Sequence, residues 1–526
     1  MQPLKLEELS IEQKIGMLFC ARNFRTSGPD NLEFILELIR NRALGCVQAP
    51  YKRPDIVKKL LDAADYPLIV VLDMEMGFPG SELPPVPLMS LSACNDPEAY
   101  RVYAKALVTD AKAAGYNSTW GPVIDVLAND GPARVYRDLS DDPNRVGEAA
   151  EQILQVFANN NFLGCGKHYP GIGRDPGMDS HMASIPAEET LEELLEGSLI
   201  PYKHLMEKGL LPTIMSGHYV YKNVDPEMLP SSLSKKTIDI IRDMGFDGVC
   251  YTDSFAMMSI LDQYGEENVL GMAIAAGNDI VLPNYRSSTR QNYEALLKNY
   301  RDGAFTEERL NEAVRRVLKL QEIVCREPEH PDLLTEEDKK VYYDIAKNCI
   351  TAVTDPGVDA ALDPENKDRL FVVLTESDLT DKELAQEAIT RNWYEPEIVI
   401  GKLKEEFPEA EIVTLPEFSN AQDNEKVLVA ATRHKEVVFV TFCTTRPYLG
   451  TDCLTRRTEA VINALTYSGK VSTVLHFGNP FAIKTLNHIP RKVFGYMMPQ
   501  SQAYAVEVLA GKLPAKGTLP FAVEFQ

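Results

Sequence analysis

The sequence predicts an α/β protein with a (β/α)8 barrel over residues 1–325, a linker over 326–345 and an α/β/α sandwich over 346–526. Two observations predict the barrel. Eight short apolar runs alternate with helical patterns, as expected for parallel strands covered on both faces. Polar residues also stand where several runs end, and in a barrel these ends converge on one mouth. A doubly wound open sheet is the alternative, but it gathers only the strand ends near its switch point.

The predicted barrel strands are continuous in hydrophobicity and rich in Val and Ile. They span residues 15–20, 45–50, 67–74, 116–126, 162–170, 211–219, 246–253 and 278–284. Helical patterns separate most of them. One is expected to start after a Ser cap at Ser234 and to stop at Gly245. Another is expected to start at Thr306, with acidic residues in its first turn and an apolar face that includes Leu310 and Val314.

The region after the predicted barrel changes in composition. Residues 326–345 are polar and contain Pro328 and Pro331, which predicts a linker followed by an entry helix. From about residue 346 six more apolar runs alternate with helical patterns. This alternation predicts a second, mostly parallel sheet covered by helices.

Composition limits the classes of function. The 526 residues include 54 Lys and Arg and 77 Asp and Glu, a net charge of −23. Such a chain repels nucleic acid and anionic lipid, so we expect neither as a partner. No apolar run approaches the ~20 residues that span a bilayer, and the N-terminus lacks a signal-peptide pattern. Nine scattered cysteines without a CxxC pair predict reduced thiols in the cytoplasm rather than a zinc site. Monomer and homodimer both remain open.

The stretch from Gly166 to His181 is the most informative one for chemistry. Lys167 and His168 end an apolar run and precede a Gly- and Pro-rich loop. Asp179 and His181 are two residues apart, so in an extended segment their side chains point the same way. A carboxylate beside an imidazole makes a general acid/base pair near neutral pH. A solvated loop without function, a metal site and a phosphate cradle are the alternatives, although neither metal-ligand nor nucleotide-loop spacing is present.

Acidic and imidazole side chains end other predicted strands. Asp253 ends the run at residues 248–253 and is expected either at the mouth or as the cap of the next helix. Asp73 has the same two interpretations, whereas Asp125 more often bonds loop amides. His218 is expected at the mouth or in the core, and His476 could face the barrel from the second part of the chain.

Taken together, these residues resemble family 3 glycoside hydrolases, in particular the β-N-acetylglucosaminidase branch used in bacterial cell-wall recycling. That branch carries K-H-F-P-G-x-G and, after a short loop, D-S-H. Here the sequence has Lys-His-Tyr-Pro-Gly-Ile-Gly at 167–173 and Asp-Ser-His at 179–181. Further matches are Asp73, Arg137 and Asp253 in their local motifs, in family order over residues 10 to about 325. The region after 346 is similar to the α/β/α domain that many members append.

The resemblance implies specific roles. Asp253 matches the nucleophile, His181 the acid/base and Asp179 the residue that orients His181. Four residues match those that hold the hydroxyls of the terminal sugar: Asp73, Arg137, Lys167 and His168. The implied activity is that of a retaining exo-β-N-acetylglucosaminidase with no metal or organic cofactor and a small carbohydrate or glycopeptide substrate. Because a neutral imidazole repels an anion less than a carboxylate does, phosphate could replace water as the acceptor.

The sequence also departs from the family pattern. Ser81 replaces an Arg that contacts the sugar in close relatives, and Ile172 stands where His is frequent. None of these changes removes a catalytic group. A family 3 β-glycosidase for another sugar and a β-N-acetylglucosaminide phosphorylase therefore remain alternatives. A non-catalytic sugar-binding protein is the alternative from another class, although binding alone requires neither Asp253 nor His181.

Overall fold

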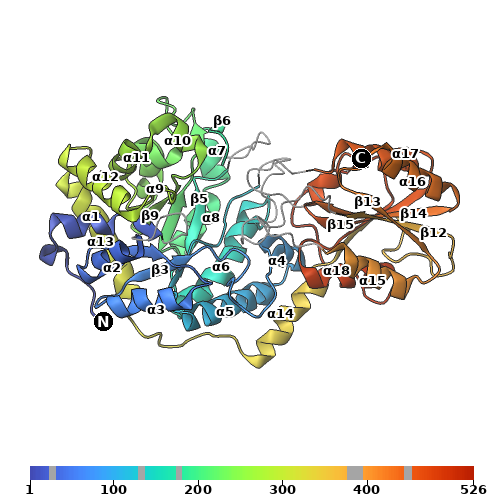
Figure 1. Ribbon diagram of the computed structural model, residues 1–526, viewed down its shortest axis with the longest axis horizontal. Helices are drawn as coiled ribbons and strands as arrows, with labels where there is room; N and C mark the ends of the chain where they lie inside the picture. The colour runs from blue at the N-terminus through green and yellow to red at the C-terminus, as the bar shows by residue number, and fades with distance from the viewer. Residues whose placement is uncertain (23–30, 128–136, 173–180, 376–394, 444–452, 526) are drawn as a thin grey trace. The chain divides into compact units, whose positions relative to one another are not determined.

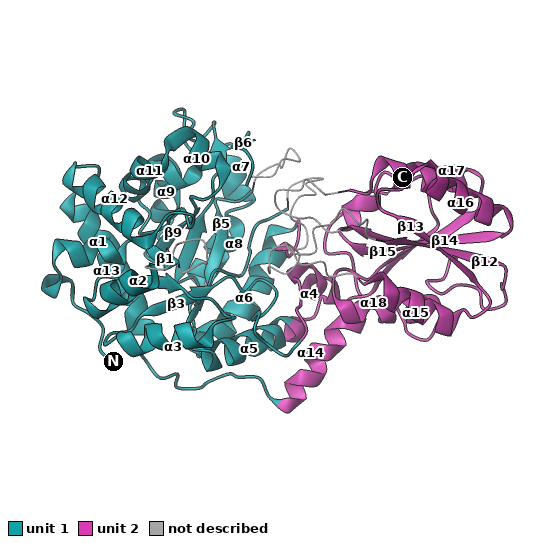
Figure 2. Cartoon of the chain, viewed as in Figure 1, with its two compact units in different colours: residues 1–83, 100–129, 142–335 teal, residues 84–99, 130–141, 336–526 magenta. Residues whose placement is uncertain are grey.

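The computed structural model describes residues 1–22, 31–127, 137–172, 181–375, 395–443 and 453–525. The chain divides into two compact units (Figure 2). The first contains residues 1–83, 100–129 and 142–335, and the second contains 84–99, 130–141 and 336–526. The second unit therefore takes two short segments from the N-terminal half. The predicted boundaries at 325 and 346 stay a prediction.

Parallel strands form the centre of the first unit. Among its described residues, one four-stranded sheet has the order β1 (Cys20–Arg22), β2 (Cys46–Gln48), β3 (Ile69–Leu72) and β4 (Ser118–Thr119). A second has the order β10 (Ile280–Leu282), β9 (Val249–Ser254), β7 (Thr213–Ser216) and β5 (Cys165–Tyr169). The predicted alternation of parallel strands and helices is confirmed.

Single bridges connect the two sheets at their edges. Phe19, just before β1, bridges to Val281 of β10. Ser118 of β4 bridges to Leu163, and Val123, beyond β4, bridges to Lys167 of β5. Closure of the strands into one barrel stays a prediction.

The helices between the strands cover the sheets on their outer side (Figure 1). The predicted Ser cap is confirmed, and the second predicted helix begins one residue after Thr306. Ser234 accepts a hydrogen bond from the Thr237 amide at the start of α9 (Lys235–Asp243), and Thr306 accepts one from Arg309 at the start of α13 (Glu307–Val324). The other long helices of this unit are α2 (Asn31–Arg40), α3 (Pro54–Ala63), α5 (Pro97–Ala113), α6 (Pro143–Asn159), α8 (Ile200–Glu207), α11 (Glu266–Ala276) and α12 (Thr289–Arg301).

The first predicted strand needs a correction. Residues 15–17 belong to helix α1 (Ile11–Met17), and the strand begins only at Cys20. Ser10 and Gln13 form a reciprocal capping box, which satisfies two backbone donors and starts the helix at Ile11. The apolar run therefore includes the buried face of a helix turn as well as the start of a strand, and a short apolar run cannot distinguish the two.

The second unit is built on a six-stranded sheet. Its order is β11 (Thr351–Thr354), β16 (Arg491–Phe494), β15 (Val471–Gly478), β14 (Glu436–Cys443), β12 (Arg369–Thr375) and β13 (Glu411–Pro416). Only the β11–β16 pair is antiparallel. Helices α15 (Pro396–Glu406) and α18 (Pro499–Leu509) lie on one face, and α16 (Ala421–Thr432) and α17 (Arg456–Tyr467) lie on the other (Figure 1). The predicted second, mostly parallel sheet is confirmed.

The helix that leads into this sheet is α14 (Glu336–Asn348). Within the described ranges, no helix combines the length and the apolar character that a membrane span requires.

Candidate active site

Lys167 lies at the centre of a three-residue charge cluster. It is on β5, with a side chain that is 3% exposed, and its Nζ lies 3.0 Å from Asp73 Oδ1 and 2.6 Å from Glu75 Oε1. Asp73 follows β3, and its side chain is 45% exposed. A buried ammonium group thus holds a carboxylate that is itself open to solvent, and such a carboxylate can accept hydrogen bonds from hydroxyl groups.

His168 is held by Asp125. The His168 backbone N–H donates to Asp125 Oδ1 over 2.9 Å, and its ring Nδ1 lies 2.7 Å from Asp125 Oδ2. Both residues are almost fully buried. The carboxylate accepts from Nδ1–H, which assigns the proton of the neutral ring to that nitrogen and fixes the ring's direction. Asp125 therefore bonds an amide of strand β5 rather than the expected loop amide, and it also orients an imidazole.

Asp253 is the second-to-last residue of β9, at the carboxyl end of the strand. Its Oδ1 accepts a hydrogen bond of 2.6 Å from the Ser254 amide. Burial acts to raise the pKa of Asp253, but the imidazoles of His168 and His218, the Ser254 amide and the imidazole of His181 outweigh it and hold the pKa well below the usual carboxyl range. Position 253 is thus in a strand, and its carboxylate is ionised at neutral pH.

His181 is held close to the segment that follows Asp253. Its carbonyl accepts a hydrogen bond of 3.1 Å from the amide of Met258, at the start of α10 (Met258–Tyr264). Ser184 Oγ donates to the Ser259 carbonyl over 2.9 Å, which makes a second link between the two segments. The His181 imidazole also lowers the pKa of Asp253, by less than the imidazoles of His168 and His218 do. Asp179 lies outside the described residues.

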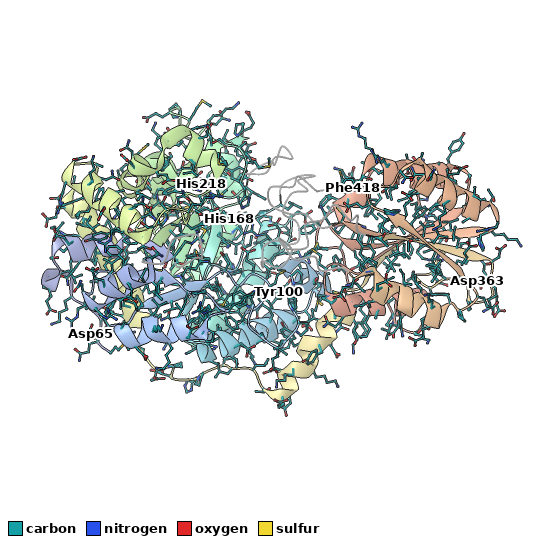
Figure 3. All side chains as sticks on the ribbon, in the orientation of Figure 1. Asp65, Tyr100, His168, His218, Asp363 and Phe418 are labelled. Carbon is teal, nitrogen blue, oxygen red and sulfur yellow. The ribbon has the colours of Figure 1, made fainter. Side chains whose placement is uncertain are left out.

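His218 is buried beside the same carboxylate. Its Nε2–H donates to the Ser254 carbonyl over 3.2 Å, and its Nδ1 accepts from Ser232 Oγ over 2.8 Å. Its ring stacks on Phe255 at 5.6 Å between centroids. Burial lowers the pKa of His218 more than the charge of Asp253 raises it, so the ring is neutral at neutral pH. His168 and His218 are both labelled in the first unit in Figure 3.

Two charged residues of this region were not among the sequence-predicted candidates. Glu75 is the second carboxylate of the Lys167 cluster. Arg22, at the end of β1, donates to Ser254 Oγ over 3.2 Å and to the Gln48 side chain. The available signal was the same one that identified Asp73, namely a charged residue directly after an apolar run. The predicted strand at 15–20 stops two residues before Arg22, where β1 ends.

Two other candidates belong to the second unit. Arg137 lies in its segment 130–141, so a role beside the side chains described above stays a prediction. His476 is fully buried in β15, where Nδ1 bonds to Thr441 Oγ1 and Nε2 donates to the Asn479 carbonyl, both over 2.8 Å. Burial lowers the pKa of His476 to about 4. Both nitrogens of this imidazole are used in holding the sheet together.

The first unit thus brings together an ionised carboxylate, three imidazoles and a buried ammonium group. Carboxylate and imidazole side chains serve as nucleophiles and as general acids or bases. In the part of the chain that the structure describes, no group of three or more His, Cys, Asp or Glu side chains is arranged to hold a metal ion.

Comparison with protein families gives one match over half of the chain. Residues 47–320 match the model of the glycosyl hydrolase family 3 N terminal domain. This range includes every site residue described above for the first unit except Arg22, and it excludes His476 of the second unit.

Curated proteins show the same relationship at modest identity. A β-N-acetylglucosaminidase/β-glucosidase of Cellulomonas fimi is 26% identical over 335 residues, which are 60% of this chain and 58% of that protein. A β-hexosaminidase of Neisseria meningitidis serogroup C is 31% identical over 180 residues, 34% of this chain and 49% of that protein. One of Xanthomonas euvesicatoria is 29% identical over 246 residues, 44% of this chain and 72% of that protein. The match with the first two covers only half to three fifths of their length.

Solved structures show the same fold over nearly the whole chain. A family 3 β-N-acetylglucosaminidase from Paenibacillus sp. FPU-7 has a TM-score of 0.79 at 23% identity, covering 98% of this chain and 100% of that one. The β-glucoside phosphorylase BglX also has a TM-score of 0.79, at 21% identity, covering 98% of this chain and 95% of that one. At such identities the likeness establishes the fold.

Proposed function

Because the chain belongs to glycosyl hydrolase family 3, we propose that it is a retaining exo-β-N-acetylglucosaminidase that acts by double displacement. The observation that carries the proposal is the setting of Asp253 at the end of β9. Its carboxylate accepts a hydrogen bond from the Ser254 amide, and the imidazoles of His168, His218 and His181 lower its pKa. A carboxylate whose pKa is held low stays ionised, which is the form a nucleophile needs.

The first step forms a glycosyl-enzyme ester. Asp253 attacks the anomeric carbon while His181 gives a proton to the departing glycosidic oxygen. In the second step His181 takes a proton from water, which attacks the same carbon and frees the Asp253 carboxylate. Two inversions give overall retention of configuration. Asp179 is proposed to orient the His181 ring, as carboxylates do for acid/base imidazoles.

The sugar is proposed to be held by four residues. Lys167 donates hydrogen bonds to its hydroxyls and the half-exposed Asp73 accepts hydrogen bonds from them, supported by the contact of 3.0 Å between the two side chains. His168 is oriented for the same task by Asp125. Arg137 is the fourth residue, carried over from the family motif alone. The natural substrate is proposed to be a small carbohydrate or glycopeptide, such as cell-wall recycling would supply.

The proposal also includes a closed barrel and a cellular location for the protein. Closure of the eight parallel strands into one barrel would bring Asp73, Lys167 and Asp253 to one mouth, and the bridges at Phe19 and Val123 support it. A cytoplasmic location is proposed because all nine cysteines are free thiols, including the adjacent buried pair Cys20 and Cys46.

Phosphorolysis is a second candidate for the same site. The side chains that lower the pKa of Asp253 are the imidazoles of His168, His218 and His181, and an imidazole repels phosphate less than a second carboxylate would. Phosphate would then replace water in the second step, its oxygen would bond to the anomeric carbon, and a sugar 1-phosphate of retained configuration would leave as Asp253 is freed. The fold likeness to BglX is compatible with this reaction.

A panel of aryl glycosides, assayed with and without phosphate, tests both candidates. We expect turnover of the aryl β-N-acetylglucosaminide, with the β-anomer of the sugar or its 1-phosphate appearing first by NMR. Asp253→Asn should lower kcat by at least about 1,000-fold, because the nucleophile is lost. Wild-type rates in Asp253→Asn, or the α-anomer as first product, would disprove the mechanism. The Glu151→Gln variant, which alters a carboxylate–imidazole pair elsewhere in the unit, is the matched control.

A further inference from the structure

Ser254, the residue after Asp253, has each of its polar groups engaged. Its amide donates to Asp253 Oδ1 over 2.6 Å. Its carbonyl accepts from His218 Nε2 over 3.2 Å, and its Oγ accepts from Arg22 Nη1 over 3.2 Å and from the Ala256 amide over 3.3 Å. The orientation of Ser254 is therefore fixed by His218, which follows β7, and by Arg22, which lies on β1 of the other four-stranded sheet.

Arg22 comes from β1, 232 residues earlier in the chain. Its Nε donates to the Gln48 side chain on β2, and its carbonyl accepts from Asn31 Nδ2 over 2.9 Å. The guanidinium carbon lies 5.6 Å from the ring centroid of Trp120 and 5.2 Å from that of Tyr285. The Arg22 guanidinium group is therefore held by hydrogen bonds through its N–H groups and by the Trp120 and Tyr285 rings near it. Its position is fixed before substrate binds, unlike that of a mobile surface cation.

The charge of Arg22 also reaches the candidate carboxylates. Burial lowers the pKa of Arg22, while Asp73 and Asp253 are among the groups that raise it. By the same interaction, the guanidinium favours the ionised form of Asp253. The side chain thus acts on Asp253 in two ways, through the Ser254 hydroxyl and through space.

We propose that Arg22 is a positioning residue for Asp253, acting with His218 to hold the Ser254 peptide so that the carboxylate points at the anomeric carbon. This inference rests on the proposed role of Asp253 as nucleophile. Arg22 does not need to touch the sugar. Its loss lets the Ser254 peptide rotate, and a carboxylate displaced by about 1 Å loses on the order of 100-fold in rate.

The test compares Arg22→Gln and Arg22→Lys with the wild-type chain on an aryl β-N-acetylglucosaminide. Arg22→Gln should lower kcat by about 10- to 100-fold with KM changed by less than about threefold, because orientation acts on the transition state. The acidic limb of the kcat/KM profile should move to higher pH, since a positive charge near Asp253 is gone. Arg22→Lys should return the acidic limb to its wild-type position but should recover only part of kcat. The positive charge is then present again, but the planar guanidinium group that makes several directed hydrogen bonds is not.

Arg286→Gln is the matched control. Arg286 also lies over the Tyr285 ring, at 5.1 Å, and its Nη1 donates to the Ala256 carbonyl two residues beyond Ser254. Its loss should change kcat by less than about threefold and leave the acidic limb in place. Circular dichroism and thermal unfolding of each variant establish that it is folded.

Ser254→Ala provides a second variant if Arg22→Gln does not fold. It removes the Oγ acceptor but keeps both backbone bonds, so kcat should fall in the same direction by a smaller factor. A higher KM with unchanged kcat in Arg22→Gln, or an acidic limb that does not move, would overturn the inference. If Asp253→Asn is inactive while Arg22→Gln and Ser254→Ala behave as wild type, only the positioning role fails. If Asp253→Asn keeps its activity, the proposed function fails first.

Discussion

The Asp125 carboxylate bonds to both the ring and the backbone of His168, at 2.7 Å from Nδ1 and 2.9 Å from the amide nitrogen. A single buried side chain therefore fixes both the backbone at position 168 and the direction of the imidazole. The Asp125 side chain comes from the segment after β4, and Val123 in the same segment bridges to Lys167 of β5. The charge cluster of Lys167 and the imidazole of His168 are thus positioned by the same segment.

Asp125→Asn is expected to impair turnover without unfolding the chain. An Asn side chain can accept from the His168 amide or from its ring, but its neutral oxygen is a weaker acceptor and its NH2 group can favour the other tautomer. Loss of such an orienting carboxylate costs about 10- to 100-fold in comparable sites. We expect that loss in kcat/KM for an aryl β-N-acetylglucosaminide, measured by steady-state kinetics.

The chain offers a matched control for that substitution. His204 Nε2 lies 2.6 Å from Glu151 Oε2, between α8 and α6, and neither residue is a site candidate. Glu151→Gln removes the same kind of pair and should leave kcat/KM within about twofold. Equal effects of the two substitutions would show that Asp125 contributes only to folding.

Much of the site could be predicted because of where charges stand in the sequence. Lys167 and Asp253 each follow buried apolar residues within a strand, and the direction of parallel strands brings such ends to one edge. The charge cluster itself could not be predicted, since the pairing of Lys167 with Glu75 depends on the path of the backbone after β3. Apolar periodicity contains no information about that path.

Arg22 shows a second limit of what apolar patterns in the sequence can predict. Residues 15–17 are apolar because one face of α1 is buried, and residues 20–22 because β1 is buried, so the two elements merge into one run. The strand predicted at 15–20 therefore stops before Arg22, and the apolar pattern alone does not place Arg22 at a strand end. Capping chemistry at Ser10 and Gln13 separates the elements, and it is visible in the sequence only when read together with the apolar pattern.

His476 is expected to make the stability of the second unit depend on pH. Burial lowers its pKa to about 4, against about 6.5 in the unfolded chain. Above pH ~6.5 His476 is unprotonated in both the folded and the unfolded chain, so its burial does not lower the free energy of unfolding. As pH falls from there toward the folded value, only the unfolded state gains the proton, so the free energy of unfolding decreases, by about 2 kcal/mol between pH 8 and pH 5.

His476→Gln isolates that contribution. Urea unfolding of both proteins at pH 8 measures the cost of the lost bonds to Thr441 and Asn479, because the imidazole is then neutral in both states. Between pH 8 and pH 5 the wild-type chain should lose about 2 kcal/mol more than the variant. Parallel pH dependences would contradict the assignment of His476 as a neutral, buried group.

Asp279 is expected to be among the most important charged residues for the stability of the first unit. Its side chain is fully buried; Oδ1 accepts from Arg309 over 2.6 Å and from Arg316 over 3.2 Å, and Oδ2 accepts from Arg242 over 2.7 Å. Oδ2 also accepts from the Cys250 amide on β9 over 3.0 Å. One carboxylate therefore joins α9 and α13 to β9, the strand that contains Asp253.

Asp279→Asn leaves the three guanidinium groups partly buried without their common anion. Breaking a buried ion pair by removing one partner costs about 3–5 kcal/mol, so we expect a loss of that size in the free energy of unfolding, measured in urea. Asp239→Asn on α9 is the control, because its pair with Lys235 is exposed and should contribute less than about 0.5 kcal/mol. A loss below about 1 kcal/mol in Asp279→Asn would mean that the desolvation of four charges cancels their attraction, as it does in some buried ion pairs.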